Sequence, residues 1–448
     1  MQDITLFNSL GGQKEKFTPL VPNEVSIYCC GPTVYNDPHV GNFRPVIVFD
    51  CLRRLFIHDG YKVTFVSNYT DVDDKIINRA KELGITEKEL TDSVIEEYRR
   101  LVSAVGSLQP DVTPRPTVYM DKIVSYVDDL VKNGSAYAAD GDVYLRVRKI
   151  KDYGELSGNT IESLESGARI DVNEKKEDPL DFALWKKTED GIKWASPWGE
   201  GRPGWHTECC VMINSIFSKQ NGLIDIHGGG FDLKFPHHEN EMAQAKAHNG
   251  NKLARYWIHN GFINMGEVKM SKSLGNVVLM KDVVEKFGGL PFRLLVLASY
   301  YRSPASFSEA TMAEATKKYS QLEISMKKAS ISLQLLGQNI ENLPIHDESA
   351  VLPALRDDLN TPNALAALYE ENKDLNNCLR TKPVDTKKLL ETFAKVYEGM
   401  EVLGLNPKKT LLSDDDKKLY MAYDEAKEKK DFAMSDKIRG ELIAKGIF

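Results

Sequence analysis

A strand, two turns and a helix follow one another near the start of the chain, and this order constrains the fold more than any other feature. Residues 24–28 alternate between polar and apolar side chains as a strand does, and Gly31-Pro32 ends that strand. Asp37-Pro38 forces a second turn, and an apolar pattern compatible with a helix runs over 43–58. A second apolar strand at 63–67 completes a βαβ unit, which predicts a parallel sheet in an α/β fold. Ligands bind such folds where a strand ends and a helix begins, so we expect the site there.

Length and composition limit the classes of protein that fit. A chain of 448 residues is too long for one ordinary core, so we expect roughly two to four domains. No apolar run approaches the roughly 20 residues that span a bilayer, so we expect no membrane partner. The net charge of −7 argues against a protein that coats nucleic acid, although a local basic groove remains compatible with it. Adjacent cysteine pairs, Cys29-Cys30 and Cys209-Cys210, suit reduced thiols or metal ligands better than disulfides, which predicts a cytoplasmic location.

Thiol, imidazole and carboxylate side chains in turn-rich stretches predict a zinc site. The set Cys30, Cys209, His237 and Glu241 offers two sulfur atoms, one nitrogen and one oxygen, which suits zinc. His237 and Glu241 are four residues apart and therefore share a face of the helix predicted to run through residue 247. The residue types alone leave other candidates open: Cys29, Cys210, His206 and His238.

Two short motifs predict a nucleotide site. His39 and Asn42 stand where the first helix begins, and Lys269 and Lys272 stand in a predicted loop of small and basic residues. A helix start, an imidazole, an amide and two ammonium groups are suited to stabilise the charge that spreads over a phosphate during its transfer. Neither motif is decisive alone, but their order around a βαβ unit is a strong indication.

An acidic run at 71–74 has two interpretations. It either binds a cation or, as we favour, caps the helix predicted at 76–83. Beyond it we expect an insertion between two halves of the sheet, with helices at 93–103 and 119–133, strands at 142–147 and an irregular charged run at 171–190. A strand at 224–227 and a loop of three glycines at 228–230 then return to the sheet.

The last third of the chain has helical spacing. Ser306 and Glu309 suggest a capping box, and apolar residues between 312 and 333 follow a 3-4 spacing typical of a helix bundle. Further helices are expected at 363–379 and 387–403. After a linker at Asn406-Pro407, a final helical pair is expected at 414–430 and 434–445.

At this point the chain resembles a known family. Residues 38–42, Pro-His-Val-Gly-Asn, and residues 269–273, Lys-Met-Ser-Lys-Ser, resemble the two signatures of class I aminoacyl-tRNA synthetases. Residues 30–35, 201–209 and 235–241 are similar to the cysteinyl-tRNA synthetase family. The first signature departs from the usual pattern at Asn42, where the family has a second histidine. An amide donates a hydrogen bond but carries no positive charge, so phosphate stabilisation would depend more on His39 and the lysines.

The resemblance implies a fold and a set of domains. We expect a Rossmann-like α/β catalytic core with a connective insertion, followed by an all-α helical bundle and a small anticodon-binding domain. The implied divisions are 1–92 and 199–262 for the two halves of the core, 93–198 for the insertion, 263–305 for a stem-contact region with the lysine loop, 306–405 for the bundle and 406–448 for the anticodon-binding helices.

The resemblance also implies an activity. We expect a monomer that ligates L-cysteine to tRNA(Cys) through a cysteinyl-adenylate, with ATP and Mg²⁺, and with one zinc ion recognising the substrate thiolate. The implied roles are as follows: zinc ligands Cys30, Cys209, His237 and Glu241; cysteine pocket Thr70 and Trp205; ATP contacts Gly31, His39, Gly41, Asn42 and Lys272; catalytic groups His39, Asn42, Lys269 and Lys272.

Two other functions remain open. One is a ligase of the same lineage that joins cysteine to a small amine, as in mycothiol synthesis, although the helical tract after Asn406 argues against it. The other is a non-catalytic zinc-binding scaffold derived from a synthetase. Such a scaffold is expected to lose His39 or the lysine pair, and the chain has both.

Overall fold

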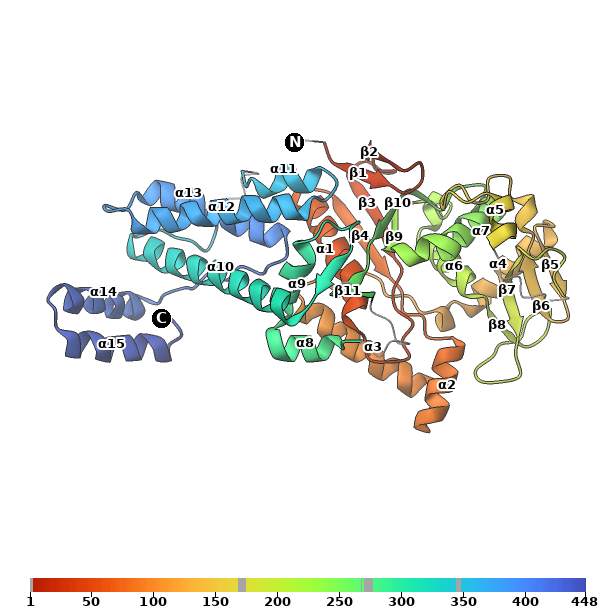
Figure 1. Cartoon of the computed structure of the whole chain (residues 1–448), viewed down its shortest axis with the longest axis horizontal. Coiled ribbons are helices and arrows are strands. Elements are labelled where there is room, and N and C mark those ends of the chain that lie inside the picture. The colour runs from red at the N-terminus through yellow and green to blue at the C-terminus, as the bar shows by residue number, and fades with distance from the viewer. Residues whose placement is uncertain (1–2, 168–174, 267, 270–276, 344–347) are drawn as a thin grey trace.

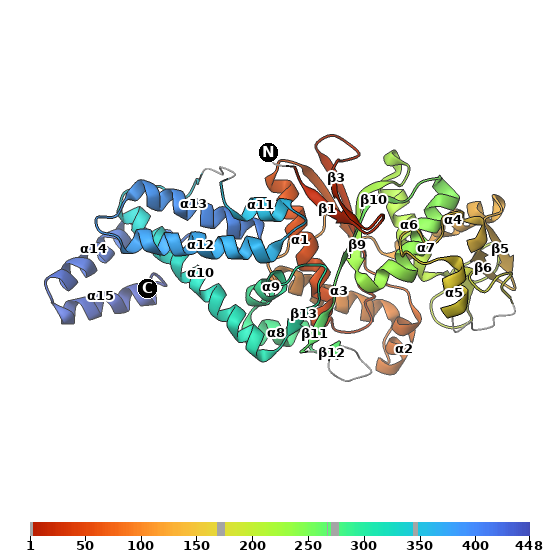
Figure 2. The same ribbon diagram turned by 45° about the horizontal axis from the view of Figure 1, so that its top comes forward.

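The structure, a computed structural model of the chain, describes residues 3–448 apart from 168–174, 267, 270–276 and 344–347. The molecule is elongated, with a parallel sheet near its middle, an antiparallel sheet towards one end and helices towards the other (Figure 1). The same order of regions is seen after rotation (Figure 2). Within the described ranges, no helix is long and apolar enough to cross a membrane.

A four-stranded parallel sheet forms the centre of the protein. Its strand order is β10 (Ala254–Asn260), β9 (Ile224–Gly230), β3 (Glu24–Cys29) and β4 (Lys62–Ser67). Helix α1 (Phe43–His58) connects β3 to β4, so the predicted βαβ unit is confirmed. The chain leaves β3 towards β4 and leaves β9 in the opposite direction towards β10. A topological switch point, where ligands bind in such sheets, therefore lies between β3 and β9.

The three glycines at 228–230 were expected to form a loop, and that prediction is wrong because they belong to β9. Gly228 pairs with Ile258 of β10. A Cβ atom at Gly228 would lie 2.0 Å from the Phe49 ring of α1, so only glycine lets the strand pass this close to the helix. Gly228 therefore allows close packing of the strand against the helix. The sequence suggested a loop because runs of glycine are common in turns.

The chain leaves the parallel sheet between β4 and β9, and the insertion expected at 93–198 lies within this longer segment. The described helices of the longer segment are α2 (Asp74–Leu83), α3 (Glu87–Ala104), α4 (Met120–Lys132), α5 (Ile161–Gly167) and α6 (Trp205–Ile216). An antiparallel sheet has the order β5 (Ala136–Ala139), β6 (Asp142–Leu145), β7 (Phe182–Lys187) and β8 (Gly201–Pro203). The Asp73 side chain accepts a hydrogen bond from the backbone of Lys75 at 2.8 Å, so the acidic run caps α2 as favoured.

The charged run at 171–190 was expected to be irregular, yet β7 lies within it. Leu184 and Trp185 are buried, and Leu145 pairs with Phe182. The apolar part of β7 is short, and two lysines at its end interrupt the alternation of polar and apolar residues by which a strand is recognised in a sequence. Tertiary pairing therefore decides its conformation more than its local composition does.

Helices make up most of the last third of the chain. A small sheet, in the order β12 (Val268–Lys269), β11 (Ile263–Met265) and β13 (Ala305–Phe307), is interrupted by α8 (Met280–Phe287) and α9 (Gly289–Leu297). The bundle comprises α10 (Glu309–Leu335), α11 (Val351–Arg356), α12 (Thr361–Arg380) and α13 (Thr386–Val402), and the final pair is α14 (Asp414–Glu428) and α15 (Phe432–Ala444). The predicted 3-4 spacing is confirmed, because these α10 residues are all buried: Met312, Ala315, Tyr319, Leu322, Met326, Ala329 and Leu333.

The capping box of α10 lies two residues later than predicted. The Ser308 hydroxyl accepts from the Thr311 backbone at 3.1 Å, and the Thr311 hydroxyl accepts from the Ser308 backbone at 2.9 Å. Ser306 cannot cap the helix because it pairs with Asn264 in the β11–β13 ladder. The domain boundaries expected from the resemblance stay predictions. The boundary expected between residues 92 and 93 falls inside helix α3.

A buried ionic group joins the core to the bundle. The His58 ring at the end of α1 lies 2.9 Å from Glu398 of α13 through Nε2 and 3.1 Å from Asp59 through Nδ1. Asp59 in turn accepts two hydrogen bonds from Arg356 of α11, at 3.0 and 2.6 Å. Hydrogen bonds to Asp59 and Glu398 raise the pKa of His58 to about 9, against the opposing effect of burial.

The protein is expected to lose stability as the pH rises from about 6.5 to 9. His58 has a folded pKa above its ordinary value of 6.5, so its contribution is complete below that value and disappears as the pH rises through 9. The contribution is at most about 3 kcal/mol. Urea unfolding across this pH window should show the decline, and His58→Gln should flatten it. An equally steep decline in the variant would assign the effect to other groups.

Candidate active site

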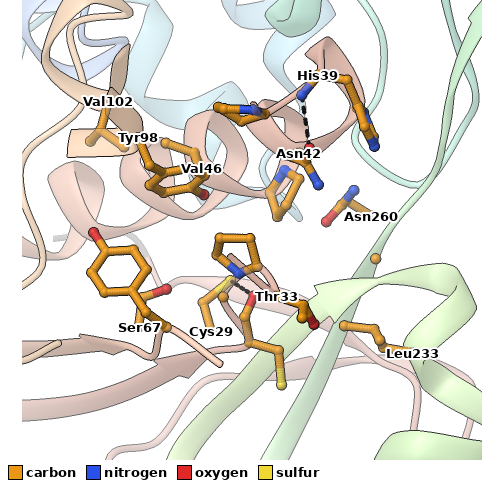
Figure 3. A pocket seen from close by; sticks show the side chains of 18 of the residues that line it. Cys29, Thr33, His39, Asn42, Val46, Ser67, Tyr98, Val102, Leu233 and Asn260 are labelled. Atoms are coloured by element: carbon orange, nitrogen blue, oxygen red, sulfur yellow. Dashed lines mark hydrogen bonds between the residues drawn. The ribbon is translucent and has the colours of Figure 1, made fainter. Parts of the chain in front are cut away.

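A cavity of about 450 Å³ opens at the carboxyl ends of β3 and β9. Figure 3 shows His39, Asn42, Asn260 and Leu233 towards one end of this cavity and Cys29, Ser67, Tyr98 and Val102 towards the other. The lining also includes these residues predicted from the sequence: Cys30, Gly31, Gly41 and Trp205. The cavity therefore lies at the switch point where the topology places a ligand.

The first nucleotide motif forms a tight turn at the edge of the cavity. His39 caps the short helix Val40–Asn42, and its backbone N–H donates to the Asn42 side-chain oxygen at 3.0 Å. Asn42 thus has a structural task, and its amide nitrogen remains the group that donates towards a ligand. The turn leads directly into α1, so the helix start and the imidazole lie on the same side of the cavity.

The second motif is only partly within the described residues. Lys272 lies outside them, and Lys269 is placed by its backbone in β12, opposite Asn264. After the second motif, the Val278 carbonyl accepts a hydrogen bond from the Val40 backbone at 3.0 Å. The chain that follows the second motif is therefore paired directly with the first motif, and residues 260–263, which connect β10 to β11, line the same cavity.

Cys30, Cys209, His237 and Glu241 come together beside the cavity. Their ligand atoms all lie within 4.8 Å of one another. The two sulfur atoms are 3.9 Å apart, and the His237 Nε2 atom is 3.7 Å from Cys30 and 3.9 Å from Cys209. Ligand atoms around a tetrahedral zinc ion with bonds of about 2.3 Å to sulfur are separated by about 3.8 Å. The spacing therefore fits zinc.

The chemistry of the donor atoms also fits a metal. The Glu241 Oε1 atom is buried and lies 2.8 Å from His237 Nε2, yet it forms no hydrogen bond with any described residue. Glu241 Oε1 and His237 Nε2 are thus close together without forming a hydrogen bond, which is the arrangement expected of two atoms that bind the same metal ion. A hydrogen bond from Cys30 lowers the pKa of Cys209 to about 7, although burial opposes this effect. Burial also acts to raise the pKa of Glu241, but His237 and His227 hold it well below its usual value.

The other candidate metal ligands have different partners from those of the four predicted residues. The Cys210 thiol donates to the His206 and Glu241 carbonyl oxygens at 3.5 and 3.4 Å, and Cys29 faces the Cys30 carbonyl at 3.9 Å. A second set, Cys30, His227, His238 and Glu241, also satisfies the distance criterion. Cys30 and Glu241 belong to both sets, so the two sets overlap and describe a place for one ion.

Neighbouring side chains orient the cluster. His206 Nδ1 lies 3.0 Å from His237 Nδ1, which leaves the His237 Nε2 atom directed at the thiols. Trp205 stacks on the His237 ring with centroids 4.3 Å apart. His227 lies between the Tyr28 carbonyl, at 3.1 Å, and the Glu241 Oε2 atom, at 2.5 Å.

Thr70 is buried behind the cavity and does not belong to its described lining. Its hydroxyl donates to Glu208 at 3.4 Å and accepts from Asn68 at 3.1 Å. Asn68 also accepts from the Gly31 backbone at 2.9 Å, and a Cβ atom at Gly31 would lie 1.6 Å from the Asn68 carbonyl oxygen. Gly31 is therefore required for this close approach between the ends of β3 and β4.

The sequence interpretation did not find several residues of the site. Asn68 precedes Thr70 at the end of β4, and Asp232 follows β9, so both stand at the carboxyl ends of strands. A polar side chain near the end of a strand was the feature of the sequence that could have identified them as site residues. Asn260, at the carboxyl end of β10, had the same signal, whereas residues 261–263, which also line the cavity, did not.

Comparison with known proteins agrees with this geometry. Residues 16–317 match the family model of the class I (C) tRNA synthetase catalytic domain, and residues 350–406 match the DALR domain. Among solved structures, methionyl-tRNA synthetase of Mycobacterium tuberculosis has a TM-score of 0.62 at 15% identity, over 85% of this chain and 90% of the other. An arginyl-tRNA synthetase of Campylobacter jejuni has a TM-score of 0.59 at 14% identity, over 86% and 94%. The fold is that of a class I tRNA synthetase, and the catalytic-domain model of that class covers about two thirds of the chain.

Sequence relatives narrow this class. The cysteine–tRNA ligase of Geobacillus sp. is 43% identical over 100% of this chain and 97% of the relative. That of Anoxybacillus flavithermus is 44% identical over 99% and 97%. The chain belongs to the cysteine–tRNA ligase family.

Proposed function

We propose that the protein ligates L-cysteine to tRNA(Cys) at the expense of ATP, through a cysteinyl-adenylate. The observation that carries this proposal is the convergence of two thiols, an imidazole and a carboxylate beside the cavity that holds the first nucleotide motif. Membership of the cysteine–tRNA ligase family supports it independently.

The first step joins cysteine to AMP. The cysteine carboxylate attacks the α-phosphorus of ATP, a new P–O bond forms, and the bond to the β-phosphate breaks to release pyrophosphate. Charge develops on the α-phosphate, and His39 and Asn42 donate to it from the start of α1. Lys269 and Lys272 are proposed to act from the opposite side, with Mg²⁺ accompanying the nucleotide. Gly31 and Gly41 let the backbone approach the ligand.

In the second step a hydroxyl of the tRNA 3′-terminal ribose attacks the carbonyl carbon of the adenylate. The ester bond forms, AMP leaves with the electrons of the broken acyl–phosphate bond, and the departing phosphate takes up the proton of the hydroxyl. The reaction needs water to be excluded so that the adenylate is not hydrolysed. Trp205, which lines the cavity and stacks over His237, is suited to shield this site and to line the cysteine pocket. Thr70 lies outside the described lining, so its part in the cysteine pocket is proposed to act through Asn68, which also binds Gly31.

We propose Cys30, Cys209, His237 and Glu241 as the residues that hold zinc. Zinc bound there supplies a soft, positively charged ligand position that favours a thiolate over the hydroxyl of serine. The protein then discriminates by requiring one specific bond from the substrate, which gives factors of roughly 10⁴ or more without a second, editing site. His227 and His206 fix the orientation of the Glu241 and His237 side chains.

The tRNA is proposed to extend from the cavity along the helical region. Residues 406–448 are proposed to read the anticodon, because α14 and α15 lie at the end of the molecule (Figure 1) and share a separate small core with the C-terminal part of α10. That core consists of Ile331, Leu412, Ile438, Leu442 and Ile447.

Transfer of radiolabelled cysteine tests the acceptor. The purified protein should charge a tRNA(Cys) transcript and should leave a glucosamine-inositol amine unmodified. Charging of the amine alone would contradict the proposal and would favour a ligase for small amines. A tRNA(Cys) transcript with a changed anticodon should be charged less efficiently by the full chain.

A further inference from the structure

Arg44, in the first turn of α1, is buried, and its guanidinium group faces backbone carbonyl groups. Nη1 donates to the carbonyl oxygen of Phe262. Nη2 donates to those of Tyr300 at 3.2 Å, of Tyr301 at 3.3 Å and of Ser303. Burial lowers the pKa of Arg44 to about 10, so the group remains a cation at neutral pH. Four carbonyl dipoles therefore converge on one buried charge.

The four carbonyl groups come from two segments far from Arg44 in the sequence. One segment, residues 260–263, connects β10 to β11, and the other comprises residues 300–303, just before β13. Arg44 has no acidic partner among the described residues, and a buried charge of this kind is costly unless hydrogen bonds offset its desolvation. Both terminal nitrogen atoms have carbonyl partners, whereas Nε has none in the described part of the chain. The planar fork of an arginine satisfies several acceptors at once, which a lysine cannot do with the same geometry.

The two segments are themselves in close contact. The Gly261 backbone N–H donates to the Tyr301 carbonyl at 2.8 Å, and the Ala305 N–H donates to the Phe262 carbonyl at 2.9 Å. A Cβ atom at Gly261 would lie 2.7 Å from the Ser303 carbonyl oxygen. The guanidinium group thus joins three segments that have little room to shift relative to one another.

Two of these three segments border the cavity, and residues 300–303 support one of them from behind through the contacts of Gly261. His39 and Asn42 immediately precede α1, and Asn260–Ile263 form the wall near them, as Figure 3 shows for Asn42 and Asn260. We propose that Arg44 is a positioning residue that fixes the distance between the first nucleotide motif and this wall, and thereby the geometry of the ATP site. The proposal rests on the proposed function, since it assigns this part of the cavity to ATP.

The test compares Arg44→Lys with Arg293→Lys. Arg293 is a matched control: it is also buried, and it binds Asp50 at 2.6 Å and the Leu403 carbonyl at 2.6 Å. Asp50 belongs to the lining of the cavity, but none of the hydrogen bonds described for Arg293 reaches residues 260–263, so this control tests the specific role of that wall. Calorimetry should give a Kd for ATP that rises about tenfold or more in Arg44→Lys and changes less than about twofold in Arg293→Lys. In ATP–pyrophosphate exchange, the KM for ATP should rise in parallel, while the KM for cysteine should change less than about twofold.

A merely structural role for Arg44 would lower the melting temperature of both variants without moving either binding constant, and this result would overturn the proposal. If Arg44→Lys bound ATP as well as the unmodified protein does, the proposal would also be wrong. Tyr301→Phe provides a second variant, because it removes the hydroxyl that donates to Asp358 at 2.8 Å but keeps the carbonyl that Arg44 needs. Its Kd for ATP should stay within about twofold. Failure of the proposed function has a different signature: the unmodified protein would bind ATP without exchange.

Discussion

Replacement of Cys209 by serine should remove zinc from the protein and lower kcat/KM for cysteine by roughly 10³-fold or more. A serine hydroxyl stays protonated near neutral pH and is a poor zinc ligand, whereas Cys209 has a pKa of about 7 and supplies a thiolate. The substitution would also remove the sulfur atom that lies 3.9 Å from the Cys30 sulfur, so only three of the four ligand atoms would remain. Zinc content by metal analysis and cysteine-dependent pyrophosphate exchange measure the two effects separately.

Cys210→Ser is the matched control for this prediction. Cys210 adjoins Cys209 and is equally buried, but its thiol donates to two backbone carbonyl oxygens, those of His206 and Glu241. The variant should keep its zinc and lose less than about tenfold in kcat/KM, because a serine hydroxyl donates to the same carbonyl groups. The opposite pattern, with zinc lost from Cys210→Ser and kept in Cys209→Ser, would show that the ligand assignment is wrong.

Replacement of Arg293 by methionine should lower the free energy of unfolding by about 3–5 kcal/mol. The side chain is fully buried between α1, α9 and the end of α13. Besides its 2.6 Å ion pair with Asp50, it donates to the Ser107 hydroxyl at 3.0 Å and to the Leu403 carbonyl at 2.6 Å. Methionine would leave these acceptors buried without their donor, which is more costly than the loss of a surface ion pair. Urea unfolding measures the difference.

Arg54→Met is the control, since Arg54 binds the same Asp50 oxygen at 2.8 Å from a more exposed position. Its loss of stability should be smaller than that of Arg293→Met by at least about 1.5 kcal/mol. Equal losses in the two variants would mean that the interaction with Asp50 alone matters, and that the contacts with Ser107 and Leu403 contribute nothing.

Local sequence patterns predicted the regular elements well. The apolar spacing over 43–58 predicted α1, and the 3-4 spacing from Met312 to Leu333 predicted the buried face of α10. Such patterns are reliable because the side chains that create them lie on the same element. They fail where distant contacts decide the conformation: β7 forms by pairing with β6, and Gly228 is a strand residue because of Phe49.

The candidate site was predictable to a similar extent. Residue types and motifs indicated the two thiols, the imidazole and the carboxylate that the structure brings together. Residue types alone did not separate Cys209 from Cys210, because adjacent cysteines differ only in which way their side chains point. The contacts of Arg44 were not predictable at all, since its partners are backbone carbonyl groups more than 200 positions away, which carry no signal in the sequence.

Cysteine-dependent exchange of pyrophosphate into ATP tests the central claim most directly. The zinc-loaded protein should exchange with cysteine, show no exchange with serine at the same concentration, and lose its activity when a chelator removes the metal and regain it when zinc is returned. This result would establish activation of cysteine through the predicted metal site. Exchange that is equal for serine, or unchanged after complete removal of zinc, would contradict it.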